Sequence, residues 1–344
     1  MKQKYDVLII GQGIAGSCLA YSLVQQGIST HIISSPIKPN ASRIAGGLIQ
    51  RISGNFLSLP DLVQDHFDDA VLFYNNLNSV FKIPIIQNYP TFRILDSSQI
   101  KLWEKKCSQK RYSAYLPLDL SPFSINQQTH QAIKFNETYV VNTELLLTLF
   151  TNFFIKKNML TLYTLQEHEL TFKKDRVEFN NITANYVIFC VGSFLKEWSL
   201  FKNFSMTNSK GDILSLRLHN PEKQVIQSDK WLAPAEDNLF KFGSTYEQDS
   251  SLAPKKSNYY ELCSSLDRLG FCDYSIHHIA SAHRCTFYDY KPSMGFLSSI
   301  PQVGIFSGFS SKGYITAPSL AQQWSRTFPG ITNKTLLPHR LNRR

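Results

Sequence analysis

Hydrophobic residues near the start of the chain change from a continuous run to a helical spacing. Residues 7–10 are all apolar, which predicts a short buried strand. Further on, apolar residues recur every three or four positions, which predicts a helix; they are Ile14, Ala15, Cys18, Leu19 and Leu23. Three glycines separate the two patterns. The segment therefore predicts a strand, a tight turn and a helix.

The glycines have the spacing Gly11-x-Gly13-x-x-Gly16 of a dinucleotide-binding turn. Gly11 lets the chain reverse, Gly13 lets a pyrophosphate approach the backbone, and Gly16 lets the helix pack closely on the strand. The amides and dipole of the helix N-terminus favour phosphate. The expected ligand is therefore FAD or NAD(P). The acidic ribose ligand of this motif is replaced by Ser34, whose hydroxyl can still hydrogen-bond a ribose.

The rest of the chain contains two kinds of pattern. The apolar run 184–192 ends in glycine and predicts a buried parallel strand with its carboxyl end at the cofactor. Helices are expected near 59–82, 99–110, 143–154, 255–270 and 318–327. Alternating polar and apolar residues predict antiparallel strands at 212–218, 224–228 and 239–246. The sequence thus predicts an α/β dinucleotide-binding domain interrupted by an antiparallel sheet domain.

Composition narrows the class of protein. The 344 residues are 43% hydrophobic, and no apolar run reaches the roughly 18 residues of a membrane span. The six cysteines form no Cys-x-x-Cys pair, so we expect free thiols, no metal and a cytoplasmic location. The net charge of +10 is compatible with nucleic acid, an anionic membrane or an acidic substrate, but the basic residues are dispersed. The basic tail 339–344 is interpreted as a solvated end.

Seven motifs occur in one order along the chain. They are 6–16, 41–49, 184–192, Lys210-Gly211-Asp212-Ile213-Leu214, Pro234 with 243–247, 282–295 and 307–318. Together they resemble the glycine oxidase and D-amino-acid oxidase/dehydrogenase family of FAD-dependent amine oxidoreductases, over most of the chain. The resemblance implies a Rossmann-like FAD-binding domain formed by 1–83, 140–208 and 287–344. It also implies a substrate domain formed by 84–139 and 209–286.

The resemblance also implies which residues bind FAD. The predicted contacts are Gly11, Gly13, Ile14, Ala15, Gly16, Ser34, Ser42, Arg43, Ala45, Gly46, Gly47, Leu48, Leu170, Gly192, Gly308, Ser310, Ser311, Lys312, Gly313 and Tyr314. Arg43 could equally lie at the surface. Cys285 stands where the family usually has proline, next to Arg284 on a predicted strand. Neighbouring strand residues face opposite sides, so we expect no thioether from Cys285 to the flavin and non-covalent FAD.

The resemblance further implies oxidative deamination of a small amino acid: glycine, a D-amino acid or an N-alkyl amino acid. In that reaction a hydride passes from the α-carbon to flavin N5. Arg284 would hold the substrate carboxylate, Lys312 would lie at the O2 edge of the ring, and Tyr246 would line the substrate pocket. Each of the three residues also has a structural interpretation. Arg284 could form an ion pair with Asp289, Lys312 could face solvent, and Tyr246 could simply pack on the sheet. The electron acceptor would be oxygen or a membrane quinone, the latter with contact at the inner face of the membrane.

Two other functions remain open. One is FAD-dependent modification of a wobble uridine in tRNA, which the positive charge favours and which needs clustered basic residues and salt-sensitive RNA binding. The other is a flavin-binding protein without catalytic activity. The Arg284→Ala variant separates amino acid oxidation from these two functions, because only a carboxylate substrate needs the guanidinium.

Overall fold

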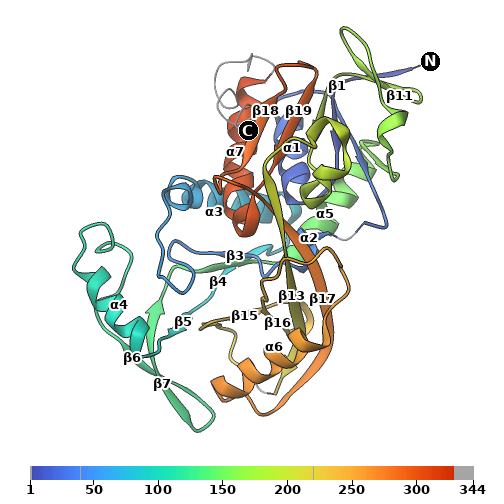
Figure 1. Ribbon diagram of the computed structural model, residues 1–344. Coiled ribbons are helices and arrows are strands. Elements are labelled where there is room, and N and C mark those ends of the chain that lie inside the picture. Colours follow the sequence, from blue (N-terminus) through green and yellow to red (C-terminus); the bar gives the residue numbers. More distant parts are fainter. Residues whose placement is uncertain (1, 39, 220, 329–344) are drawn as a thin grey trace. The chain divides into compact units, whose positions relative to one another are not determined.

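The computed structural model describes residues 2–38, 40–219 and 221–328 (Figure 1). The chain divides into two compact units. Unit 1 comprises 1–43, 144–209 and 283–344, and unit 2 comprises 44–143 and 210–282. Residues 44–83 fall in unit 2, whereas the boundaries expected from sequence place them with the FAD-binding domain. Residues 329–344 of that expected domain, including the basic tail, lie outside the described residues.

Unit 1 is built on a mixed sheet with a parallel centre. Its main path runs β10 (Thr171–Phe172), β11 (Val177–Phe179), β12 (Ile182–Phe189), β1 (Gln3–Ile10), β2 (Thr30–Ser34) and β9 (Leu160–Leu162). β19 (Val303–Ser307) also pairs in parallel with β12, and β18 (Ser293–Phe296) pairs antiparallel with β19. The strands β1, β2, β9, β12 and β19 are mutually parallel, so their carboxyl ends meet at one edge. Ligands of such sheets bind outside this edge.

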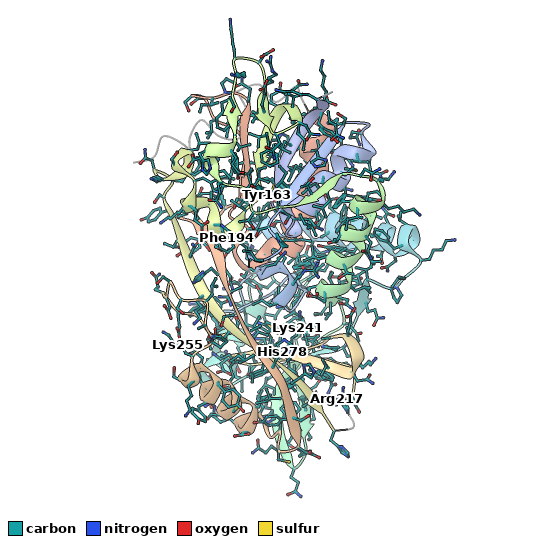
Figure 2. The ribbon with its side chains drawn as sticks, turned by 90° about the vertical axis from the view of Figure 1, so that its right-hand side faces the viewer. Tyr163, Phe194, Arg217, Lys241, Lys255 and His278 are labelled. Carbon is teal, nitrogen blue, oxygen red and sulfur yellow. The ribbon has the colours of Figure 1, made fainter. Side chains whose placement is uncertain are left out.

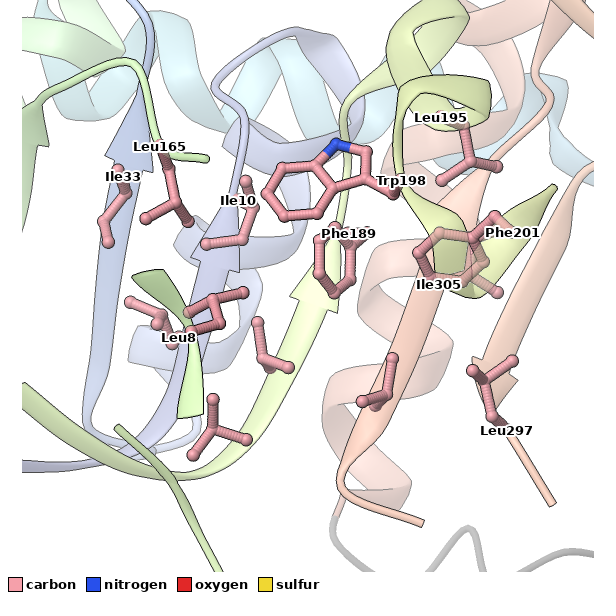
Figure 3. Close-up of a cluster of buried hydrophobic side chains, with 14 of the residues drawn as sticks. Leu8, Ile10, Ile33, Leu165, Phe189, Leu195, Trp198, Phe201, Leu297 and Ile305 are labelled. Atoms are coloured by element: carbon pink, nitrogen blue, oxygen red, sulfur yellow. The ribbon is translucent and has the colours of Figure 1, made fainter. Parts of the chain in front are cut away.

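Helices α1 (Ile14–Gln25) and α7 (Gly313–Thr327) pack against each other in unit 1. Unit 1 also contains most of α2 (Ala41–Ile44) and α5 (Thr143–Lys156), and the short 3₁₀ helices Glu167–Glu169, Gly192–Glu197, Ser199–Phe201 and Ser310–Lys312. Apolar side chains of β1, β2, β12 and β19 form its core with the 3₁₀ segments after β12 (Figure 3). Phe189 stacks edge-on against Trp198 and Phe201 there.

Unit 2 contains a large sheet in the order β17 (Tyr274–Phe287), β13 (Met206–Leu218), β16 (Leu239–Gly243), β15 (Trp231–Pro234), β14 (Val225–Gln227), β5 (Thr91–Ile94), β7 (Gln128–Phe135) and β6 (Ser121–Ile125). The boundary between the units falls within β13 and β17. Strands β13 to β16 pair antiparallel, as do β5, β7 and β6, but β14 and β5 are parallel. The strands predicted at 212–218, 224–228 and 239–246 therefore lie in an antiparallel segment of this sheet, and the parallel pairing of β14 with β5 joins it to β5, β7 and β6.

Both faces of this sheet carry buried residues, and helix α6 packs on one of them. Helix α6 (Lys256–Leu269) places Leu262 and Leu266 in a hydrophobic cluster with one face, including Ile94, Leu214 and Phe242. Unit 2 also holds a small sheet of β3 (Leu48–Ile49), β8 (Tyr139–Val141) and β4 (Ile86–Asn88), with helices α3 (Asp61–Phe81) and α4 (Ser97–Cys107) and the short 3₁₀ helix Glu236–Asn238. Both faces of the large sheet carry buried residues, because Arg93, Gln227 and Ala233 are buried as well.

Several predicted elements differ in extent from the observed ones, and two of these differences involve candidate site residues or their neighbours. The helix expected from Pro318 begins at Gly313, so Pro318 lies inside it, although its missing N–H removes one helical hydrogen bond. The strand expected at 239–246 ends at Gly243, so Tyr246 lies beyond it. Among the described residues, no helix is both long and apolar enough to cross a bilayer.

Candidate active site

The turn after β1 needs glycine at three positions for three different reasons. Gly11 has φ +100°, and a Cβ there would lie 2.7 Å from the carbonyl oxygen of Cys190. A Cβ at Gly16 would overlap the carbonyl oxygen of Gly11, so α1 packs on the turn without room for a side chain. A Cβ at Gly13 would meet only the Ser42 hydroxyl oxygen, at 3.1 Å, and Asn40. Gly13 is therefore the position where the backbone is open to a ligand.

Polar groups surround the first turn of α1. The Ile14 amide donates to the Ser42 hydroxyl at 3.0 Å, and Asn40 accepts from the Ser42 amide at 3.0 Å. The Tyr314 hydroxyl, from α7, donates to the Ser42 carbonyl at 2.7 Å. No acidic side chain lies in the first turn of α1. Amides of a helix N-terminus, a hydroxyl and no carboxylate form a site suited to a diphosphate.

The carboxyl end of β2 carries Ser34, at the position of the motif's ribose ligand. The Gln12 amide donates to its hydroxyl at 3.3 Å, which fixes that hydroxyl against the glycine turn. Gly192 follows β12 with φ +56° and has nothing within 4 Å of a Cβ position, so the backbone there is open. Leu170 is different: its side chain is buried in the core of unit 1. Unit 1 thus brings Ser34 to the glycine turn and uses the Leu170 side chain for packing.

Arg43 forms an ion pair in this structure. Its Nη1 donates to Glu144 Oε1 at 2.6 Å and to the Thr148 hydroxyl at 3.2 Å, both on α5. The pair is partly exposed, and such pairs contribute little to stability. Contact of Arg43 with a phosphate stays a prediction.

The segment 45–48 is held by other residues of unit 2. A Cβ at Gly46 would lie 2.5 Å from the Trp231 ring, and Gly47, with φ +67°, lies against the carbonyl of Val141. The Lys241 ammonium donates to the Ala45 carbonyl at 2.9 Å and to the Thr143 hydroxyl at 2.8 Å. Figure 2 shows Lys241 on the sheet of unit 2 near His278. Lys241 and Trp231 thus fix a segment expected to lie under the flavin.

Strand β17 separates Arg284 from Cys285 as the sequence predicts. Cys285 is buried in the core of unit 1, with its Sγ 3.8 Å from the Ser307 hydroxyl. Burial raises the pKa of the Cys285 thiol to about 11, so it stays protonated and unreactive at neutral pH. Arg284 is half-buried. Because adjacent strand residues face opposite sides, Arg284 points away from the side occupied by Cys285.

The segment after β19 has an unusual backbone. Gly308 has φ +82°, and a Cβ there would overlap the Phe287 ring. Ser310 has φ +51° and begins the 3₁₀ turn that leads into α7. Lys312 ends this turn, and its amide donates to the Phe309 carbonyl at 2.9 Å. Burial lowers the pKa of the Lys312 ammonium from 10.5 to about 8.

The strain at Gly308 gives a direct stability prediction. Gly308→Ala should lower the free energy of unfolding by about 3 kcal/mol, because it adds both a left-handed penalty and a clash with Phe287. Gly27→Ala is the matched control: Gly27 has φ +74° but nothing within 4 Å, so only about 1 kcal/mol is expected. Chemical denaturation of both variants measures the difference. If the two variants lost equal amounts of unfolding free energy, the packing of Gly308 on Phe287 would be contradicted.

The family model described as "FAD dependent oxidoreductase" (DAO) matches residues 6–324. The chain belongs to this family. Its cofactor is FAD.

Solved structures share the fold of this DAO-family chain at low sequence identity. Iminodiacetate oxidase from Chelativorans sp. BNC1 has a TM-score of 0.77 at 16% identity, covering 97% of this chain and 98% of that one. Glycine oxidase from Bacillus cereus ATCC 14579 has a TM-score of 0.78 at 15% identity, covering 98% and 99%. L-α-glycerophosphate oxidase from Mycoplasma pneumoniae with FAD bound has a TM-score of 0.72 at 14% identity, covering 97% and 96%.

The residues of unit 1 fit the FAD of the DAO family. A diphosphate needs close backbone approach and helix N-terminal amides, which Gly13, Ile14 and Ser42 supply. Three residues around the candidate site were not predicted from the sequence: Asn40, Trp231 and Lys241. Asn40 lies beside the motif 41–49, so its position was a usable signal. Trp231 and Lys241 lie about 190 residues away, and no local pattern marks them.

Lys210 and Asp212, of the family's Lys-Gly motif, are fully buried in unit 2. Asp212 accepts from the Asn258 amide nitrogen at 2.8 Å and from the Lys255 amide at 3.2 Å. The Lys210 ammonium lies 3.9 Å from Asp212 and 3.7 Å from Asp249. Buried charges that are paired and hydrogen-bonded in this way hold strands together, which indicates a structural role for the motif. Tyr246 is 67% exposed in unit 2.

Proposed function

We propose that this protein is an FAD-dependent enzyme that oxidises a small amino acid (glycine, a D-amino acid or an N-alkyl amino acid) at its α-carbon. The observation that supports it most is the pair on β17. Cys285 packs into the core, and Arg284 beside it faces the other way with a planar fork suited to a carboxylate.

Several of the predicted site residues have a role in this proposal. Gly13, Ile14 and Ser42 bind the diphosphate, Ser34 the ribose, and the segments 45–48 and 308–314 the flavin. Arg284 binds the substrate carboxylate and thereby fixes the orientation of the α-carbon. Lys312 places a positive charge at the O2 edge of the ring, and Tyr246 contributes a wall of the substrate pocket.

The chemistry needs little from the chain beyond binding and orientation. When bound by the residues named above, FAD would supply the acceptor for the hydride that leaves the substrate α-carbon. The lone pair of the neutral substrate amine forms the C=N bond as the C–H bond breaks, and water hydrolyses the resulting imine to an oxo acid and an amine. This explains why the proposal assigns no nucleophile or paired carboxylates. Arg284 acts by holding the carboxylate in place while the bonds change.

The experiment that tests the proposal is a substrate panel under anaerobic conditions. Purified protein should be yellow, and glycine, sarcosine or one of the D-amino acids should bleach its visible absorbance. Bleaching by dithionite but by no amino acid in the panel would reject the proposal. Adding oxygen, or a soluble quinone, to the bleached protein then identifies the electron acceptor by whichever restores the colour.

The low pKa of Lys312 predicts a pH dependence of stability. The unfolded chain holds the lysine proton up to about pH 10.5, whereas the folded protein releases it near pH 8. The unfolded state therefore binds more protons between these values, and the contribution of Lys312 to stability rises with pH across this window. Lys312→Met should stabilise flavin-free protein at pH 7 and flatten its unfolding free energy between pH 8 and 10.5. Denaturant titrations of both proteins across this pH range measure the unfolding free energy. If its dependence on pH were the same in Lys312→Met as in the wild type, the burial of the ammonium would be contradicted.

The net charge of +10 supports the alternative substrate, a modified wobble uridine of tRNA. This alternative predicts tRNA binding that weakens steeply with salt. It is tested by gel-shift titration at two salt concentrations with the same protein. Tight, salt-dependent tRNA binding together with failure of every amino acid would favour it over the amino acid.

A further inference from the structure

Arg93 is a buried arginine in unit 2 whose charge no acid balances. It lies on β5, and its side chain is 3% exposed. Burial lowers the pKa of its guanidinium to about 10, so it remains charged at neutral pH. Among the described residues, no carboxylate lies within ion-pair distance of it. An uncompensated buried charge is costly, which makes Arg93 unusual in this chain.

Two other basic side chains of unit 2 have acidic partners. Arg51 pairs with Asp68 and with Glu137, at 2.5 and 3.1 Å. Lys210, fully buried, lies within 4 Å of Asp212 and Asp249. Arg51 and Lys210 thus have acidic groups beside them, whereas Arg93 has none among the described residues.

The contacts that Arg93 does make are long and neutral. Nη1 lies 3.5 Å from the Gln227 side-chain oxygen, and Nη2 lies 3.3 Å from both Asn55 Oδ1 and the Ser228 carbonyl. Nε is buried and has no hydrogen-bond partner among the described residues. Charge-assisted bonds to a carboxylate are about 2.7–2.9 Å. The guanidinium thus has both charge and donor capacity left for an anion.

The surroundings of Arg93 are polar and lie on the sheet face opposite α6. Phe92 and Ile94, its strand neighbours, belong to the α6 cluster, so Arg93 faces the other side. Gln227 is its direct partner on β14, and the Gln227 amide nitrogen donates to the Gln50 side chain. Asn55 is exposed, in the turn closed by Ser53 and Ser58. Side-chain amides beside a buried cation provide donors that a carboxylate also needs.

We propose that Arg93, with Gln227, Gln50 and Asn55, forms a binding site for a carboxylate of a small organic acid. The Arg93 fork takes the two carboxylate oxygens, and the neighbouring amides complete the hydrogen bonds. The carboxylate belongs to a separate organic acid and not to the amino acid whose oxidation is proposed above. This proposal concerns a residue other than Arg284 and does not depend on the reaction proposed above.

Succinate is the probe, and the purified full-length protein with its FAD is titrated calorimetrically. The wild type should bind succinate and not its neutral diamide, succinamide. Arg93→Met should weaken succinate binding by roughly 30-fold or more, because it removes one partner of a buried charge pair. Arg217→Met, at an exposed arginine of β13 (Figure 2), should leave the affinity unchanged.

Gln227→Glu tests the same site while keeping Arg93. The new carboxylate would stand beside Nη1, so it should supply the missing counter-charge, abolish succinate binding and raise the melting temperature. Equal succinate affinity in the wild type and both variants, or no succinate binding by the wild type, would overturn the proposal. Succinate affinity and melting temperature are both independent of catalysis, so these results hold even if no amino acid is oxidised.

Discussion

Arg284→Ala is expected to lower kcat/KM for the amino acid substrate by about 100-fold or more. The loss of a bidentate guanidinium–carboxylate pair costs about 2–5 kcal/mol, because the substrate carboxylate then lacks its counter-charge. The effect should fall on both KM and kcat, because the same contact orients the α-carbon. Anaerobic bleaching of the flavin by substrate, followed in a stopped-flow instrument, measures both quantities. The FAD content of the variant should equal that of the wild type.

Two further variants separate binding from structure. Arg284→Lys keeps the charge but loses the planar fork, so it should recover only part of the lost activity. Arg217→Ala, at an exposed position, should behave as wild type. If Arg284→Ala instead lowered the melting temperature and FAD content while the remaining holoenzyme kept its kcat/KM, Arg284 would be a structural residue.

The N-terminal half of the site could be predicted from sequence because its signals are local. The run 7–10 and the helical spacing that follows it fix β1 and α1 within a few residues, and Gly11 and Gly16 stand where other backbone approaches most closely. The alternation of Arg284 and Cys285 could be predicted for the same reason, since two neighbouring strand residues must face opposite sides.

Features that depend on distant residues could not be predicted. The start of α7 at Gly313, before Pro318, depends on its packing against α1, nearly 300 residues earlier in the chain. The support of 45–48 by Trp231 and Lys241 exists only once β15 and β16 are folded. Arg93 lies in a short strand with no motif around it, and its isolation is visible only when its neighbours are known. Periodicity identifies elements, but not which element lies against which.

Gly13→Asp is expected to abolish FAD binding without harming the fold. Gly13 has φ −83° and ψ −166°, which any residue adopts, and it precedes α1 as its N-cap. Aspartate is a preferred N-cap, so the flavin-free protein should gain about 0.5 kcal/mol of stability. The new carboxylate would occupy the space of the diphosphate and repel it, so FAD affinity should fall by about 100-fold or more. The ratio of flavin to protein absorbance and the melting temperature of the flavin-free protein measure the two opposite effects.

Gly16→Ala is the contrasting variant, because a Cβ at that position would overlap the carbonyl oxygen of Gly11. It should lose about 1–3 kcal/mol of stability whether or not FAD is present, since the clash is between α1 and the turn. The two glycines therefore separate ligand approach from helix packing within one motif. A Gly13→Asp protein that purifies with a full complement of FAD would show that the diphosphate does not bind at this turn, and the roles proposed for Ile14 and Ser42 would fail with it.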